Sequence, residues 1–366
     1  QPDRKSDLFH LIGSQAHFHS QGDIQIISDE DIILNELIVK LASAKFNMHA
    51  PKAEIKNSHI TFLEPASLHY RLHPELIRYL NLELPQWPQL DNIPNIHLDI
   101  KKLSFPLDRR RLNELQCNAL MKIDHLSIKD FRHGYPFAFE GFQLNLDKQK
   151  EKNIYDFDIK TKVSKQEQSV KGTLLAKGSF NNLLNNSVPT EGNLHLSGKR
   201  IPLLSVEAII NKKDMLTPIL GQEVYIDASL KKDADHNYLI KLNGGTDKSN
   251  ASLNFIINDK GIKSLKSPLE NKLYLNVTSD SLQAISKFYN KGSGIKPSFF
   301  STSNELLIPA SLILDLSSYQ WVTKKSSDDS YLQAKLSSSP ILLFNNLNKK
   351  RLKFTQFQGK ALIKGS

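Results

Sequence analysis

Short segments in which apolar and polar residues alternate run through most of the chain. The clearest is K-L-Y-L-N-V at residues 272–277, where two leucines and a valine are separated by a tyrosine and an asparagine. Successive side chains of a strand point to opposite faces, so this period of two predicts a strand with one apolar face. Over residues 29–44 the apolar spacing also fits a helix in part, but the β-branched content favours strands. Residues 1–20 show little pattern and are expected to be irregular.

Helical periodicity is confined to a few short segments. After the strand at 272–277, Ser279 can cap a helix, and Leu282 and Ile285 follow at helical spacing. Residues 201–210 (I-P-L-L-S-V-E-A-I-I), with a proline near the start, are the other helix candidate. The sequence therefore predicts a mainly β chain with a few short helices.

A unit made of a strand and a following helix occurs twice. Residues 65–80 match the segment that ends at Ile285, because Leu68 corresponds to Leu273 and Leu80 to Ile285, with 205 residues between the members of each pair (273 − 68 and 285 − 80). A third copy of the strand begins at Pro309 with the same P-A-S-L. Such repeats predict a modular architecture.

Shorter repeats mark other strands. Residues 96–105 and 119–128 share an alternating start and a two-residue kink before L-S, at a constant offset of 23 residues (126 − 103). We expect neighbouring strands that bend at the same height. The pattern G-x-[LA]-x-x-x-G at 172–178, 192–198 and 359–365 places glycine at both ends of a predicted strand, where tight turns or bulges need it.

Breaks in the pattern divide the chain into three modules. The proline-rich residues 84–94 separate a first β module (1–90) from a second (91–290), and a Gly-Ser-Gly linker opens a partial third module (291–366). The chain begins with Gln and stops just after a strand-like segment. We interpret it as a segment of a longer protein, with any signal or membrane anchor outside it.

Composition narrows the class of protein. The 366 residues are 39% apolar and carry a formal net charge of +10. Lysine is scattered over positions expected to be exposed on strands, which is typical of charged edges that discourage aggregation. The longest basic clusters are residues 109–111 and 348–351.

Cys117 is the only cysteine, which excludes an intramolecular disulfide and cysteine-based metal sites. No apolar run reaches the roughly 18 residues of a membrane-spanning helix.

The motifs of common catalytic and cofactor sites are absent from the sequence. It contains no Walker loop, no G-x-S-x-G, no H-E-x-x-H and no dinucleotide fingerprint. His17 with His19 and His69 with His73 form close pairs, but no cysteine or carboxylate stands at ligand spacing, so surface histidines are favoured over a metal site. Neither tryptophan lies near a basic cluster, which argues against a nucleic-acid surface. The sequence predicts no enzyme, no metal, no cofactor and no nucleic-acid partner.

The repeated units resemble parts of the AsmA-like and TamB-like proteins of the bacterial envelope. The resemblance rests on P-E-L-I-x-x-L at residues 74–80, S-D-S-L-x-x-I at 279–285, the helix followed by L-G at 201–221 and the G-x-L-x-x-x-G strands. It implies a long twisted antiparallel sheet curled into an open groove. It further implies a periplasmic protein, anchored in the inner membrane through a missing segment, that serves phospholipid delivery to the outer membrane with other envelope proteins as partners.

The apolar sides of the alternating strands are the candidate binding surface. Short helices can cover part of a one-sided apolar sheet and acyl chains the rest, because each buried methylene contributes about 0.8 kcal/mol. We expect phospholipid acyl chains to contact Leu98, Ile100, Ile123, Leu174, Leu194, Leu273, Leu275 and Val277. Two other interpretations stay open: a structural or adhesive β-repeat protein with a closed dry core, and an enzyme or nucleic-acid binder whose site the sequence does not reveal.

Overall fold

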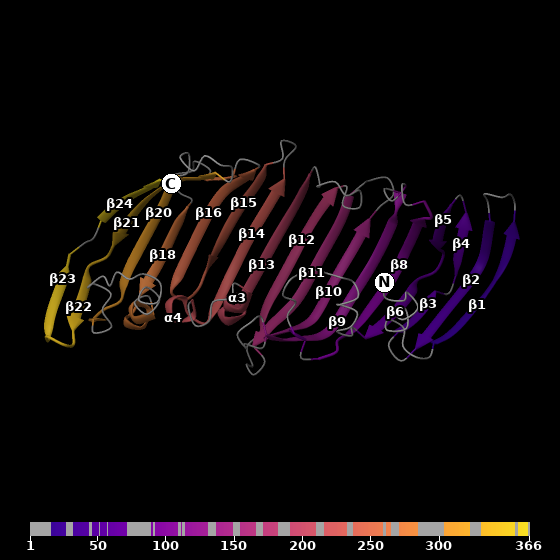
Figure 1. Cartoon of the computed structure of the whole chain (residues 1–366), viewed down its shortest axis with the longest axis horizontal. Helices are drawn as coiled ribbons and strands as arrows, with labels where there is room; N and C mark the ends of the chain where they lie inside the picture. The colour runs from indigo at the N-terminus through magenta and orange to yellow at the C-terminus, as the bar shows by residue number, and fades with distance from the viewer. Residues whose placement is uncertain are drawn as a thin grey trace, which may run out of the picture. The chain divides into compact units, whose positions relative to one another are not determined.

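The chain is mainly β in the computed structural model. It forms a long antiparallel meander sheet of at least 15 strands with few short helices, and the sheet is not closed on itself (Figure 1). The fold class predicted from the alternation is thereby confirmed. The structure describes residues 16–26, 32–43, 46–50, 52–56, 58–71, 89–90, 92–108, 111, 114–130, 137–148, 154–165, 171–181, 191–209, 216–232, 237–258, 261–264, 271–284, 304–322, 331–355 and 358–364.

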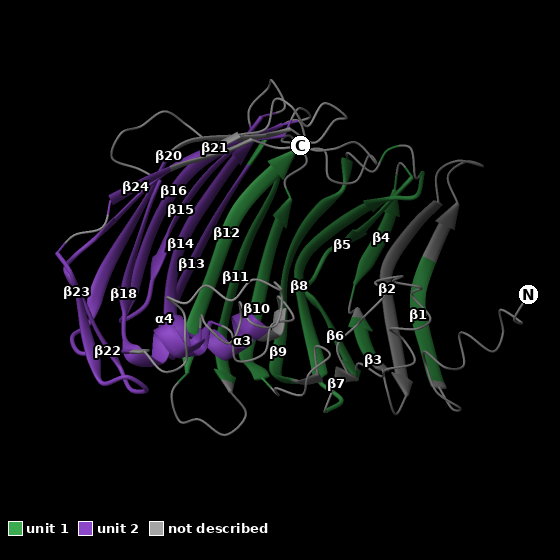
Figure 2. Ribbon diagram, turned by 60° about the vertical axis from the view of Figure 1, so that its left-hand side comes forward, with its two compact units in different colours: residues 1–192 green, residues 193–366 purple. Residues whose placement is uncertain are grey.

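The chain divides into two compact units, residues 1–192 and 193–366 (Figure 2). The three modules predicted from sequence are a different division and stay a prediction. The strands of the first unit are β1 (Ala16–Ile26), β2 (Ile32–Ser43), β3 (Phe46–Ala50), β4 (Ala53–Lys56), β5 (His59–Phe62), β6 (Ala66–Arg71), β7 (Gln89–Leu90), β8 (Asn95–Pro106), β9 (Gln116–Asp130), β10 (Phe137–Lys148), β11 (Ile154–Lys165) and β12 (Gly172–Asn181).

Antiparallel pairing fixes the strand order of the first unit. The neighbours run β1–β2–β3–β6–β8–β9–β10–β11–β12. The β4–β5 hairpin joins through β5, which pairs with the end of β8, and β7 pairs with β9. The strands favoured over residues 29–44 are confirmed by β2. In contrast, β1 begins at Ala16, inside the stretch expected to be irregular, because its backbone pairing with β2 does not require buried side chains: Phe18 is exposed.

The two kinked segments with the offset of 23 are β8 and β9, which are neighbours as predicted. The predicted bends do not fall at the same height. The register of β8 shifts between Ile100 and Lys102, opposite Asn118 and Ala119, whereas the matching step in the sequence of β9 follows Ile123, which pairs with Ile96 near the start of β8. Because the pair is antiparallel, equal positions in two sequence copies fall at opposite ends of the pair.

The second unit has a main sheet, a small sheet and short helices. The main sheet contains β13 (Gly192–Pro202), which begins at the unit boundary, β14 (Glu223–Lys232), β15 (Tyr238–Gly245), β16 (Ser249–Asn258), β17 (Gly261–Ser264), β18 (Lys272–Val277), β20 (Ala310–Val322), β21 (Tyr331–Ser338) and β24 (Gln358–Lys364). The small sheet is β19 (Asn304–Leu306), β22 (Ile341–Asn345) and β23 (Lys350–Phe354). The helices are α3 (Leu203–Ile209) and α4 (Thr217–Leu220), and residues 279–284 are also helical.

The two short strands β17 and β18 occupy the same position in the strand order of this sheet. Both β17 and β18 pair with β16 on one side and with β20 on the other. Asn271 bridges the step between them: its N–H donates to Ser252, its carbonyl accepts from Leu316, and its Oδ1 accepts from the Asn254 N–H at 2.7 Å. Its φ of 95° lies in the left-handed region, which asparagine adopts more readily than most residues.

The predicted strand-then-helix unit is present at the second copy, where β18 is followed by the helical residues 279–284. In the first copy the strand is β6, and the helix half, residues 74–80, lies outside the described residues. The third P-A-S-L strand is β20. The predicted helix over 201–210 begins two residues later as α3, because Ile201 and Pro202 still belong to β13.

The core cluster of the second unit lies where the small sheet meets the main sheet. Val277 of β18, Leu282 of the following helix and Leu343 of β22 are buried together, and Leu275, Leu306, Leu312 and Ile341 pack against them. The Ser279 hydroxyl ties this helix to β19, because its Oγ accepts from the Leu306 N–H at 2.9 Å. Among the described residues, the small sheet and the helix therefore cover the end of β18 and the start of β20, where Val277 pairs with Ala310.

Candidate binding faces

Cross-strand register collects apolar side chains into rows on one face of the first unit. One row of successive partners runs from β3 to β12 through Met48, Leu68, Leu98, Met121, Leu144, Ile159 and Ala176. Directly opposite residues of an antiparallel pair share a face and lie within contact distance of each other. We call the face that carries this row the first apolar face.

The opposite face of the same strands is polar. Lys122 Nζ contacts Asp99 Oδ2 at 2.9 Å, and Lys177 pairs with Asp158 at the same distance. The rings of His69 and His97 meet edge to face with centroids 4.6 Å apart. One sheet face is therefore solvated and held by ion pairs, as the alternation in the sequence predicts.

The side chains of the apolar row are only half-buried. This holds for the leucines, methionines and isoleucine from Met48 to Ile159, and only the small Ala176 is buried. Leucine and isoleucine in a closed core are usually buried completely. Within the part of the chain that the structure describes, the side chains of this row are therefore covered less completely than those of a closed core.

The second unit repeats this arrangement. Partners across β15, β16, β18, β20 and β21 form a row of Gly244, Ala251, Leu273, Leu314 and Leu336, and Leu242 pairs with Leu253 beside it. All of these residues are half-buried. We call the face that carries this row the second apolar face. The other face carries Asn243, Ser252, Lys272, Asp315 and Lys335 at successive partner positions.

The sequence-predicted lining residues all lie on these faces. Leu98, Ile100 and Ile123 belong to the first apolar face, as does Leu174, which is two residues from Ala176 on β12. In the second unit, Leu194 alternates with His195, whose ring lies 3.9 Å from Asp227 on the polar face. Leu273, Leu275 and Val277 follow one another on β18. Val277, however, is 4% exposed beneath Leu282 and Leu343, and Ile123 is 8% exposed, so we leave both out of the open surface.

Lysine–tyrosine pairs end the apolar rows at two hairpins, and neither pair was predicted from the sequence. Lys148 is the partner of Tyr155 and its Nζ lies 5.4 Å from the ring centroid, while Lys232 is the partner of Tyr238 at 5.1 Å. Both lysines are buried, and burial lowers the pKa of the Lys148 ammonium. The signal that could have found them is a lysine at an apolar-face position just before each turn.

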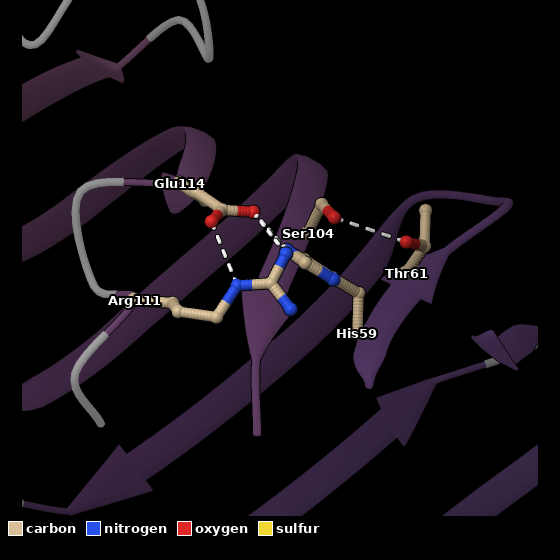
Figure 3. Close-up of polar contacts among 5 residues, drawn as sticks. All are labelled: His59, Thr61, Ser104, Arg111 and Glu114. Atoms are coloured by element: carbon tan, nitrogen blue, oxygen red, sulfur yellow. Dashed lines mark hydrogen bonds and ion pairs between the residues drawn. The ribbon is translucent and has the colours of Figure 1, made fainter. Parts of the chain in front are cut away.

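A polar cluster on the first unit joins β5, β8 and the turn before β9 (Figure 3). Arg111 donates from Nε and Nη2 to the two carboxylate oxygens of Glu114, both at 2.7 Å, and Glu114 Oε2 lies 3.2 Å from His59 Nε2. The hydroxyls of Thr61 and Ser104 lie 3.0 Å apart. The imidazole thus faces a carboxylate and the serine faces a threonine, which is not the base–nucleophile pairing of a serine hydrolase. The cluster fastens the turn to the sheet.

A surface cavity of about 860 Å³ in the second unit is bordered by polar and charged residues together with Pro218, Val224 and Tyr225. It lies beside α4 and is bordered by Asp247, Lys248 and Asp280 among others. Arg200 and Glu223, which also line it, pair through two hydrogen bonds of 3.0 and 3.2 Å. These two lining residues therefore form an ion pair with each other.

The described part of the chain shows no arrangement of side chains suited to a metal site or a reactive thiol. There, no group of three His, Cys, Asp or Glu side chains is placed to hold a metal ion. Burial, with a smaller effect of Asp147, raises the pKa of the Cys117 thiol, so its reactive thiolate form is disfavoured. Among the described helices, none combines the length and apolar character needed to cross a membrane.

Glu140 gives the first unit a specific pH dependence. A hydrogen bond from Lys171 is the main cause that lowers the pKa of this carboxyl below its ordinary value of 4.5, and Ser164 adds a weaker one. A carboxyl whose pKa is lower in the folded state stabilises the fold above pH 4.5, and this contribution disappears as the pH falls through the lowered pKa.

We therefore expect wild type to exceed Glu140→Gln in stability by about 0.5–1 kcal/mol at neutral pH, because the pair is partly solvated. The difference should vanish in acid. Thermal melts at neutral and acidic pH measure it, with Lys171→Met as the matched variant. A constant difference across this range would contradict the assignment.

Comparison with protein-family models, with curated proteins and with solved structures found no match to this chain.

Proposed function

We propose that this chain is a non-enzymatic envelope protein that binds or conducts phospholipid, with the acyl chains lying along the apolar faces of its sheet. The observation that carries the proposal is the row of half-buried apolar side chains from β3 to β11. In this proposal each apolar face is the inner wall of an open groove. The resemblance to AsmA-like and TamB-like proteins supports a periplasmic location between the inner and outer membranes.

The chemistry of the face favours an acyl chain over a compact ligand. The members of the row from Met48 to Ala176 are aliphatic or methionine side chains on successive strands, and neighbouring strands of a sheet are spaced by about 4.8 Å. A flexible hydrocarbon can follow such a stripe, and every methylene it removes from water contributes about 0.8 kcal/mol. The polar cavity of the second unit lacks this property, because arginine and carboxylates border it.

The test is the lipid that the protein carries. We expect phospholipid to be extracted from purified wild type and identified by mass spectrometry. Leu144→Asp should lower the lipid content several-fold, because the row position then presents a carboxylate to the acyl chain. Asn145→Asp is the matched control, since it adds the same charge to the exposed opposite face of β10 and should leave lipid content unchanged.

The alternative is a structural or adhesive β-repeat protein with a closed dry core. It predicts that wild type carries no lipid, takes none up from vesicles, and is unfolded by Leu144→Asp. That combination of results would overturn the lipid proposal. Equal lipid loss in Leu144→Asp and Asn145→Asp would also contradict it, because a general effect of negative charge would then explain the result.

A further inference from the structure

The β22–β23 hairpin combines exposed apolar side chains with a block of positive charge. It is the turn and edge strand at residues 347–354, drawn at the yellow end of the chain in Figure 1 and here called the hairpin patch. Every residue in it is exposed, and the apolar members Leu347, Leu352 and Phe354 are 82%, 47% and 39% exposed. Its charged members are Lys349, Lys350, Arg351 and Lys353, with no Asp or Glu between residues 341 and 355.

The tip of this hairpin is held in a defined conformation. Asn345 Oδ1 accepts from the N–H groups of Leu347 and Asn348 at 3.0 and 3.1 Å, and Asn348 Oδ1 accepts from the Lys350 N–H at 3.1 Å. Lys349 has a left-handed φ of 56°, and its Nζ lies 5.9 Å from the Phe344 ring centroid. The turn therefore presents Leu347 outward with the lysines beside it.

The base of the hairpin is anchored in the second unit. Leu343, which pairs with Leu352, is 1% exposed and packs with Val277 and Leu282. A neighbouring carboxylate is that of Glu305 on β19, whose Oε1 accepts from Asn346 Nδ2 at 2.6 Å. The exposed apolar and basic residues are thus the outward continuation of a packed element.

We propose that the hairpin patch docks on the surface of an anionic phospholipid bilayer. Burying an exposed leucine and phenylalanine in the headgroup region removes apolar surface from water, while four cations attract acidic lipids. A nucleic-acid surface would favour aromatic side chains for base stacking, whereas two of the three apolar residues here are leucines. The proposal concerns a membrane contact and does not require lipid on the apolar faces.

Vesicle flotation of the full chain tests the docking. We expect binding to vesicles of phosphatidylglycerol and phosphatidylcholine, weak binding to phosphatidylcholine alone, and loss of binding between about 0.1 M and 1 M salt. Each basic residue near an anionic surface is worth about fivefold in partitioning. Replacing Lys349, Lys350, Arg351 and Lys353 by Gln should therefore lower binding by far more than tenfold. Leu347→Ser should lower it by about tenfold.

The matched control carries Lys199→Gln, Lys231→Gln, Lys241→Gln and Lys335→Gln, four exposed strand positions in the same unit. Both quadruple variants reduce the net charge equally, from +10 to +6 (10 − 4). The control should retain most of the binding. Equal losses in the two variants would overturn the proposal, because net charge would then suffice.

Two further results would also overturn the proposal. One is absence of wild-type binding to anionic vesicles. The other is a hairpin variant that loses affinity for a nucleic-acid duplex while it retains vesicle binding. The lipid content of the hairpin variant separates this proposal from the proposed binding of lipid on the apolar faces. The variant leaves those faces unchanged, so its lipid content should equal that of wild type.

Discussion

Leu343→Asp is expected to lower the free energy of unfolding of the second unit by about 3–5 kcal/mol. Leu343 is 1% exposed, and Val277 and Leu282 surround it where β22 meets β18 and the helix that follows. A carboxylate there loses its water without gaining a partner, and the leucine's packing is lost as well. Thermal and urea denaturation followed by circular dichroism measure the change.

The matched variant is Leu314→Asp in the same unit. Leu314 pairs with Leu273 and Leu336 on the second apolar face and is half-buried. Its carboxylate can reach water across the open face, so we expect a cost of about 1–2 kcal/mol. Equal losses for Leu314→Asp and Leu343→Asp would mean that the face is as closed as the core cluster, which would contradict the open face on which the lipid proposal depends.

The alternation in the sequence was sufficient to predict the strands because a sheet with one apolar and one polar face requires it. The segment at 272–277 is β18, and its apolar members share one face as the period of two demands. The strand of the repeat was found at β6 and β20 for the same reason. Strands held by backbone pairing alone carry no such signal, which is why the start of β1 was missed.

Local kinks were visible in the sequence, but their positions across the sheet were not. The two-residue steps at 101–102 and 124–125 interrupt the alternation in the sequence, and the first coincides with the register shift of β8. Their relative height depends on the register of an antiparallel pair, which the hydrophobic pattern of each strand does not fix by itself. A glycine with a φ of 57° at position 141 marks a register shift in β10 that the pattern of that strand also left undetected.

The sequence predicted which face of each strand carries the candidate site, but not which residues on that face are buried. Alternation assigns Leu275 and Val277 to one side of β18, yet only the packing of the small sheet distinguishes the half-buried Leu275 from the buried Val277. That contact joins β22 to a helix more than 50 residues earlier, and no local pattern encodes it. The basic cluster at 348–351 was recognised in the sequence. That it lies beside the exposed Leu347 is known only from the structure of the β22–β23 hairpin.

Glu207 is the second residue whose replacement should have a large effect. It lies on α3, is 1% exposed, and its Oε1 accepts from the N–H groups of Leu216 and Thr217, the latter at 2.7 Å. These groups stand at the start of α4, whose N-cap residue Leu216 makes no side-chain capping bond. Glu207 therefore caps α4 from a neighbouring helix, and it holds this short helix in place.

Glu207→Ala should lower the free energy of unfolding by about 2–4 kcal/mol, because two N–H groups lose a carboxylate acceptor and a buried void is left. Glu207→Gln is the control: its amide oxygen can still accept, so we expect a loss of about 1 kcal/mol. Hydrogen exchange adds a local measurement, since the amides of Leu216 and Thr217 should exchange faster in Glu207→Ala. The Ser281 hydroxyl also donates to carbonyl oxygens of α4, so loosening should extend to residues 279–284. Unchanged exchange at Leu216 and Thr217 in a destabilised Glu207→Ala protein would show that the residue acts by packing rather than by capping.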